Sequence, residues 1–284
     1  MNLKYTDNTS NADFRLVIEE PAFDRKFFTR DREDKLLTIA WNRGEEQKII
    51  IDEIEYTFPA NSIIPLMVNQ SFRFENPEYI TSWLFNREFY CIVDHDKEVS
   101  CSGFIFYGPT PIMFISLDEK EQEKIDLLVR IFKDEFDTSD KIQGAMLRML
   151  LVRLIITITR LARQQFTDET VDDDTKFSLY RNFNLLVENH YRKEHEVQFY
   201  AGKLNKSPKT LANVFAIYGQ KTPLQIIQER INLEARRLYY YTDKSTKEIA
   251  SELGFEDASH FSRFFKKHFG VSPTDFKKSL EKVA

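Results

Sequence analysis

Cysteine and histidine are scarce in this chain of 284 residues, and their scarcity excludes several classes of protein. Cys91 and Cys101 stand alone, without a C-x-x-C spacing, so neither a disulfide framework nor a zinc ribbon can form. We therefore expect a reducing compartment, the cytoplasm. One of the five histidines lies in the first half, His95 between Asp94 and Asp96, and one imidazole does not make a metal site. The sequence predicts no metal, no cofactor and no catalytic residue.

Long apolar runs are also missing. A membrane helix needs about 20 consecutive apolar residues. Val99–Leu117 is broken by glycines and prolines, and Met146–Leu161 by three arginines, which indicates an amphipathic helix. The polar start Met1–Ser10 has no apolar stretch of the kind found in signal peptides. We expect no membrane among the partners.

Charge is unevenly divided between the two parts of the chain. Residues 176–284 hold 19 Lys and Arg against 12 Asp and Glu, a balance of +7, whereas the whole chain carries −5, which leaves −12 for the rest. A basic domain of this size suits a polyanion-binding module, because neutralised phosphates release condensed counterions. A solvated basic surface would have the same composition.

The first part of the chain is rich in short β-type runs that recur about every ten residues. They are Leu36–Trp41, Lys48–Ile51, Ile54–Phe58, Ser62–Leu66, Ser71–Glu75, Tyr79–Phe85 and Cys101–Phe106. Aromatic and β-branched residues with turn formers between the runs predict a small antiparallel barrel or sandwich over 1–117. Such a barrel can enclose a ligand.

Residues 118–166 change to a helical period. Asp118–Phe136 and Ile142–Phe166 carry apolar residues at helical spacing, more than one face can bury against a small barrel. The pair predicts a homodimer, with packing inside one chain as the alternative. The acidic segment 167–175 has no apolar period and predicts a linker that precedes a domain over 176–284.

The last domain contains a helix, a tight turn and a second helix in Ser245–Phe269. Ser245 and Glu248 form a capping box, Gly254 can adopt the left-handed conformation that ends a helix, and Asp257 can cap the next helix. The small Ala250 allows the two helices to cross closely.

The same arrangement occurs upstream. A helix over Val197–Leu204 is followed by a turn at Asn205–Lys206 and by a helix that starts at Ser207-Pro208 and runs to Tyr218. Pro223–Tyr241 predicts a connecting helix of about 30 Å, close to one turn of B-DNA at about 34 Å. Two recognition helices could therefore meet one duplex.

These motifs resemble the AraC/XylS family of bacterial transcription regulators over about residues 177–282. The matching residues are Ser207, Pro208, Leu211, Phe215, Gly219, Pro223, Ile231, Asn232, Ala235 and Arg236 upstream, and Ile249, Ala250, Leu253, Gly254, Phe255, Ser259, Phe261, Arg263, Phe265, Lys266, Gly270 and Pro273 downstream. The resemblance implies an all-α domain of two helix-turn-helix units joined by a linker helix. It also implies sequence-specific binding of double-stranded DNA and control of transcription.

The first part is similar, more loosely, to the cupin-like sensor domains of the same family, through Gly44–Pro59 and the helical pair. The fold class expected is thus α+β: a cupin-like small β-barrel, an amphipathic helical pair and an all-α DNA-binding domain. A small-molecule effector and RNA polymerase join DNA and a second copy as expected partners. The alternative function is a regulator whose first part is a protein-interaction or dimerisation module. An enzyme such as a DNA alkyl-transfer protein would need a reactive cysteine in a metal cluster.

Family position and groove chemistry assign candidate contacts on DNA. The predicted base contacts are Lys209, Asn213, Ser259, His260, Ser262 and Arg263, and the predicted phosphate contacts are Thr210, Lys221, Lys266, Lys267 and Lys277. The Arg263 fork suits guanine O6 and N7, and the Asn213 amide suits adenine N6 and N7. An ion pair of Arg263 with Glu256 or Glu252 is the alternative. The family often has Arg in place of Asn213 and Lys in place of Ala216, so the upstream unit is expected to hold phosphates less firmly.

Overall fold

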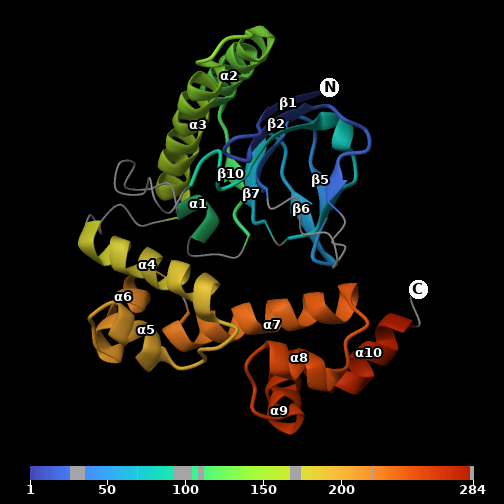
Figure 1. Cartoon of the computed structure of the whole chain (residues 1–284), viewed down its shortest axis with the longest axis vertical. Helices are drawn as coiled ribbons and strands as arrows, with labels where there is room; N and C mark the ends of the chain where they lie inside the picture. Colours follow the sequence, from blue (N-terminus) through green and yellow to red (C-terminus); the bar gives the residue numbers. More distant parts are fainter. Residues whose placement is uncertain are drawn as a thin grey trace. The chain divides into compact units, whose positions relative to one another are not determined.

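The computed structural model describes residues 1–25, 36–68, 70–91, 104–107, 112–166, 174–218 and 221–281. The chain divides into two compact units, Met1–Glu169 and Thr170–Ala284 (Figure 1). Each unit has its own apolar core. Within the ranges given, no helix has both the length and the apolar character needed to cross a membrane. The Asp94-His95-Asp96 triplet and most of the predicted acidic linker, 167–173, lie outside the described residues.

Two antiparallel sheets form the first unit. The larger has the order β1 (Asn2–Asp7), β2 (Ala12–Ile18), β9 (Ile80–Phe85), β4 (Leu37–Asn42), β7 (Ser62–Leu66) and β10 (Ile115–Ser116). The smaller has the order β3 (Asp24–Arg25), β8 (Phe72–Phe74), β5 (Gln47–Ile51) and β6 (Ile54–Phe58). One short 3-10 helix, Pro77–Tyr79, precedes β9, and a short helix α1 spans Phe104–Tyr107.

Apolar side chains from both sheets share one core. It contains Ala40, Ile49, Ile51, Phe58, Ile64, Leu66, Phe72, Phe74 and Ile80, all buried. The opposite side of the larger sheet is covered by helices α2 (Glu119–Asp137) and α3 (Gln143–Phe166). Phe132 of α2, for example, lies 5.5 Å from the Phe14 ring and 6.3 Å from the Trp83 ring, centroid to centroid.

The fold class predicted from the sequence is confirmed in outline, with corrections. The two sheets do not close into a barrel, since β1, β10, β3 and β6 remain edge strands in the described part of the chain. The run Cys101–Phe106 is not a strand where the structure describes it, because 104–107 is helical. Barrel closure was not predictable, because strand spacing indicates how many strands form but not which edge strands pair. The helix at Phe104–Tyr107 was not predictable either, because four consecutive apolar residues show neither a strand period nor a helix period.

The second unit is all-helical. Its helices are α4 (Asp174–His190), α5 (Val197–Lys203), α6 (Pro208–Tyr218), α7 (Pro223–Tyr241), α8 (Thr246–Glu252), α9 (Ala258–Phe269) and α10 (Pro273–Glu281). Capping boxes begin α7 at Thr222 and α8 at Ser245, and Asp257 caps α9 by accepting from the His260 amide at 2.6 Å. The sequence therefore begins these helices at the positions that two helix-turn-helix units require.

Candidate nucleic-acid interface

The upstream recognition helix α6 exposes one continuous stripe. Its buried side consists of Leu211, Val214 and Phe215. Its exposed side consists of Lys209, Ala212, Asn213, Ala216 and Ile217. Because these exposed residues are spaced three and four apart, they lie on one face of the helix.

The downstream recognition helix α9 is built in the same phase. Phe261 and Phe265 are fully buried, and its exposed stripe consists of Ser259, His260, Arg263, Lys266 and Lys267. Gly270 ends the helix in the left-handed conformation, with φ of 74°. This end leaves the cationic residues in the last turns, where they also favour the helix dipole.

The two helices correspond position by position at an offset of 50 residues. Leu211 and Phe215 are buried where Phe261 and Phe265 are buried. The same offset relates the exposed residues: Asn213 to Arg263, Ala216 to Lys266 and Ile217 to Lys267. The turns before the helices are similar but not equal in length: Asn205 and Gly254, which are 49 positions apart, both have positive φ, 52° and 75°. The two units thus share a frame and differ in the chemistry that they present.

Three of the predicted DNA contacts already have partners within the protein. The Ser262 hydroxyl donates to the Ala258 carbonyl at 2.6 Å and is half-buried. The Thr210 hydroxyl lies 2.9 Å from the Ser207 hydroxyl at the helix start. The Lys221 ammonium pairs with Glu229 at 2.7 Å. These side chains would have to exchange a bond before they could contact DNA.

Arg263 is the cation best placed to reach a base. Its side chain is exposed, and no ion pair holds it among the residues that the structure describes. Of the two alternative partners, Glu252 pairs with Lys244 and lies 3.6 Å from Arg192 instead, and Glu256 forms no ion pair with Arg263 in the described part of the chain. The amide of His260 lowers the pKa of the Asp257 carboxyl, and the Arg263 charge adds to this effect. The guanidinium therefore keeps its donors available for guanine.

A direct contact joins the end of α4 to the downstream turn. A Cβ added at Gly254 would overlap the carbonyl oxygen of Arg192. Beside it, Nε2 of His195 lies 2.8 Å from the Leu253 carbonyl, and the His195 ring packs on Phe255 at 4.7 Å. Burial lowers the pKa of His195, and the hydrogen bond with the Leu253 carbonyl partly offsets this effect. The contact joins α4, which packs against α6, to the downstream helix-turn-helix unit.

A buried network of ion pairs on α7 also connects this helix to α4 and to the segment that follows α4. The Glu234 carboxylate, 4% exposed, contacts Arg230 at 3.3 Å, Arg237 at 3.6 Å and Arg192 of the segment after α4. Burial alone would raise the pKa of Glu234, but the three guanidinium groups outweigh it and hold that pKa at about 2. Arg230 also binds Glu188 of α4 at 2.7 Å. The linker helix is thereby fixed to α4.

Two exposed lysines lie close to α6 in the sequence although they were not among the predicted contacts. Lys203 ends α5 and Lys206 lies in the upstream turn, both exposed. The Lys203 ammonium lies 5.5 Å from the centre of the Phe199 ring. With Lys209 they form a row of cations three residues apart, and this spacing is the signal that could have identified them.

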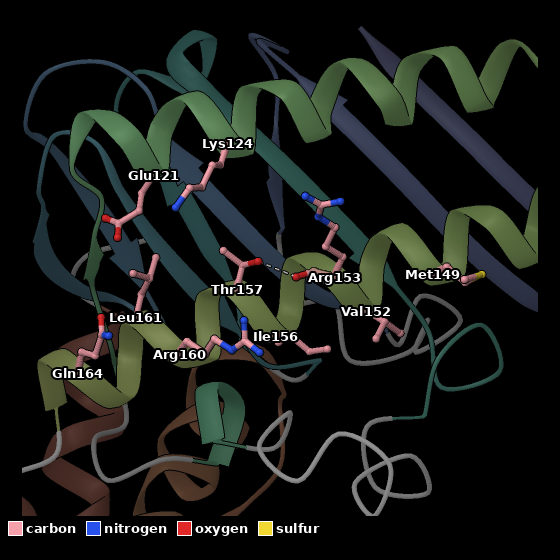
Figure 2. Close-up of a pocket in the computed structure, with 10 residues that line it drawn as sticks. All are labelled: Glu121, Lys124, Met149, Val152, Arg153, Ile156, Thr157, Arg160, Leu161 and Gln164. Atoms are coloured by element: carbon pink, nitrogen blue, oxygen red, sulfur yellow. Dashed lines mark hydrogen bonds between the residues drawn. The ribbon is translucent and has the colours of Figure 1, made fainter. Parts of the chain in front are cut away.

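A second candidate surface lies on the helical pair of the first unit. Between α2 and α3 runs a groove of about 610 Å³, seen close up in Figure 2. Its apolar side chains are Met149, Val152, Ile156 and Leu161, and its charged ones are Glu121, Lys124, Arg153 and Arg160. The Thr157 hydroxyl in the groove donates to the Arg153 carbonyl at 2.8 Å.

Further apolar side chains are exposed on the same helical pair. Among the described residues, ten large apolar side chains are exposed, and five of them lie on α2 and α3 or directly before α3: Leu127, Ile131, Ile142, Met146 and Met149. Helix α2 carries seven acidic and four basic residues, whereas α3 carries four arginines and no acid. The two helices are opposite in charge, which suits pairing with a partner of the same construction.

The family model that matches this chain lies within its second unit. A helix-turn-helix domain model matches residues 200–279. The HTH-type transcriptional activator RhaS of Salmonella arizonae is 24% identical over 167 residues, 59% of this chain and 58% of the relative. RhaS of Salmonella schwarzengrund is 24% identical over 161 residues, 57% and 56% of the two chains. The alignments thus span little more than half the length of these curated relatives.

Solved structures with a similar course of the chain were also found. ToxT from Vibrio cholerae O395 is 15% identical and has a TM-score of 0.42, with 95% of this chain and 97% of that chain covered. The DNA-binding domain of AdpA, in complex with a target DNA, is 22% identical and has a TM-score of 0.32. It covers 36% of this chain and 90% of its own.

Proposed function

We propose that this chain is a DNA-binding transcription regulator of the AraC/XylS family, and that α6 and α9 read two boxes of one duplex. The observation that carries the proposal is the pair of exposed stripes, related by 50 residues, within one compact unit. In a helix-turn-helix the second helix enters the major groove with its early residues on base edges. Asn213 and Arg263 occupy corresponding positions for this role.

The linker helix sets the distance between the boxes. Helix α7 spans 19 residues, or about 28 Å at 1.5 Å per residue. One turn of B-DNA is about 34 Å, so the two helices can reach successive major-groove segments on one face. The Glu234 network and the Gly254 contact keep this separation constant.

Phosphate contacts complete the interface. We propose Lys266, Lys267 and Lys277 for the downstream box. Lys203 and Lys206 serve the upstream box, because the recognition stripe of α6 has few charges of its own. Cations at the edges of a groove fix the register of the helix without reading sequence.

Selection from a random duplex library tests the proposal. The full chain and a fragment from Thr175 to Ala284 are selected in parallel, and enrichment of two boxes about one helical turn apart is the expected result. Enrichment by the fragment alone would indicate that the first part of the chain restrains DNA binding until an effector acts. If neither protein enriches a site, the proposed function is wrong.

The helical pair supports a second proposal, a homodimer formed by α2 and α3. A partner's acidic α2 would lie against this chain's α3, with its four arginines, and the symmetric contact would follow. The exposed apolar side chains would then be buried at the centre of the interface. Two copies would present two DNA-binding units to neighbouring sites.

Sedimentation of the full chain tests the homodimer. The wild type is expected to sediment as a dimer, and Met149→Asp, at a position 68% exposed, is expected to shift it to monomer, because a charge would enter the apolar interface. Tyr79→Asp is the matched control, since Tyr79 is also exposed but lies in the 3-10 helix before β9 and not on α2 or α3. A monomeric wild type, or equal behaviour of both variants, contradicts the proposal.

The first unit is proposed as the regulatory domain, and two signals can be distinguished. A small-molecule effector between the sheets would need space, but the described core there is filled by large buried side chains such as Phe58, Phe72 and Phe74. This packing favours regulation through dimerisation or a protein partner, RNA polymerase being the one a promoter supplies. A cytoplasmic location follows from that role.

A further inference from the structure

The recognition stripe of α6 is unusually apolar for a surface that meets nucleic acid. Three of its five exposed residues are apolar: Ala212, Ala216 and Ile217, the last 42% exposed. On α9 the positions corresponding to Ala216 and Ile217 are lysines. The apolar surface surrounds Asn213, which lies one residue from Ala212 and three from Ala216.

We propose that α6 reads A·T base pairs, with Asn213 bound to an adenine and the apolar side chains packed on thymine methyl groups. This inference rests on the proposed function, and it predicts that the two boxes differ in base composition. The thymine C5-methyl is the apolar group of the major-groove edge, and adenine presents the N7 acceptor and N6 donor that an Asn amide matches. The stripe offers both partners side by side.

The arrangement of the stripe fits neighbouring base pairs. Residues one helical turn apart have Cβ atoms about 5–6 Å apart, and base pairs rise 3.4 Å along each strand. Ala212 and Ala216, one turn apart, therefore reach base pairs one or two steps apart, with Asn213 between them. The small alanines let the helix approach the base edges closely, while Ile217 extends further along the groove.

Guanine recognition has little support on this helix. Guanine presents acceptors, which Arg or Lys donors satisfy. Beyond Lys209 in the first turn, the exposed stripe of α6 carries no positive charge, whereas the exposed stripe of α9 carries Arg263, Lys266 and Lys267. The cations near α6 are Lys203 and Lys206, which precede the helix and suit phosphates at the groove edge. We therefore expect guanine in the downstream box and A·T pairs in the upstream box.

The test uses the full chain and the duplex that it selects. The box contacted by α6 is the one whose enriched sequence changes in selection with Asn213→Ala. Each thymine of that box is then replaced by deoxyuridine, which removes the C5-methyl alone. Binding is expected to weaken about 3- to 4-fold at each contacted methyl, the equivalent of about 0.8 kcal/mol per buried carbon. Preference for adenine at the Asn213 position is expected to fall about 5- to 100-fold in Asn213→Ala.

Ile217→Asn supplies the coupled measurement. Because the side chain stays exposed and only its apolar surface is lost, the deoxyuridine effect at one thymine should disappear in this variant. Lys267→Asn, at the corresponding position of α9, is the matched control and should leave that effect unchanged.

Four results would overturn the inference. Guanine at the centre of the α6 box, or deoxyuridine substitutions that change nothing, would leave the two-box regulator intact but contradict A·T reading. Selection of a single box, unaltered by any α6 variant, would mean that the apolar stripe faces a protein. Failure of the chain to enrich any site would overturn the proposed function itself.

Discussion

The two helix-turn-helix units of this chain share their buried positions and differ at their exposed ones. Leu211 and Phe215 in the upstream unit occupy the places of Phe261 and Phe265 downstream, and all four are buried. The exposed residues change from Asn, Ala and Ile to Arg, Lys and Lys at the same offset. Packing thus fixes the buried positions of each helix-turn-helix unit, while the exposed residues differ. On the proposed function, the downstream unit would supply charge for phosphate contacts, and the upstream unit would supply contacts that depend on shape.

The largest effect is expected where the frame itself is held. Glu234→Gln removes the charge that three arginines face, two of them, Arg230 and Arg237, buried. Breaking a buried pair leaves uncompensated charge, so the free energy of unfolding should fall by about 3–5 kcal/mol. Glu229→Gln, in the partly exposed pair with Lys221, is the control and should cost less than about 1 kcal/mol. Urea denaturation measures both, and equal small losses would contradict the role of the network.

Acid should remove the same contribution in the wild type. The pKa of Glu234 is about 2 in the folded chain, below its ordinary value of 4.5. Folding therefore favours the ionised carboxylate. Its stabilisation is complete above pH 4.5 and is lost as the pH falls towards 2. Glu234→Gln should lack this part of the pH dependence, and a parallel pH profile in both proteins would contradict the assignment.

The next effect on stability is expected at the contact between Gly254 and the Arg192 carbonyl. Gly254 and Gly270 both have φ near +75°, but only Gly254 has a neighbour, the Arg192 carbonyl, where a Cβ would stand. Gly270→Ala should cost about 1 kcal/mol for backbone strain. Gly254→Ala adds overpacking and should cost about 3 kcal/mol. Thermal denaturation compares the two, and equal costs would indicate that the end of α4 yields easily.

Arg263 sharpens the comparison on the side of DNA. Arg263→Ala should weaken binding to the selected site by about 1–3 kcal/mol and relax the preference at one base pair. Arg263→Lys keeps the charge but loses the fork, so it should show the same relaxed preference. Titration against single base-pair variants of the site measures both. A uniform loss in the Ala variant, restored by Lys, would assign Arg263 to phosphate.

Local signals predicted the second unit well, whereas contacts distant in sequence were not predictable. Proline, capping boxes and apolar phase fixed the bounds of α6, α7 and α9 almost to the residue. The contact of Gly254 with Arg192 joins residues about sixty positions apart, and neither carries a periodic signal that points to the other. In the first unit the predicted β-type runs begin at Leu36 and leave out β1 and β2; β1 has no buried residue, whereas β2 alternates with Ala12, Phe14 and Leu16 buried.

The candidate site shows the same division. Helical phase alone predicted which residues of α6 and α9 are exposed, and most of them are. It could not predict that the Ser262 hydroxyl bonds back to the Ala258 carbonyl, since this depends on the side-chain rotamer. Nor could it find Lys203 and Lys206, which lie before the recognition helix rather than on it.

The smallest effect is expected when one residue is exchanged between the two helices. This exchange separates phosphate contacts, which make binding depend on salt, from contacts to bases. Ala216→Lys gives α6 the cation that α9 has at Lys266, and Lys266→Ala does the reverse. The flexible four-carbon stem of Lys can carry its charge to a phosphate from a position where Ala faces base edges. Each phosphate contact contributes about 0.9 to the slope of log K against log salt concentration. The first variant should steepen that slope by about 1 and the second should flatten it by about 1, with the preferred sequence of the other box unchanged. Binding isotherms between about 50 and 200 mM salt measure the slopes. If Ala216→Lys left the slope unchanged, position 216 would lie away from the backbone, and the difference between the two units would concern base reading alone.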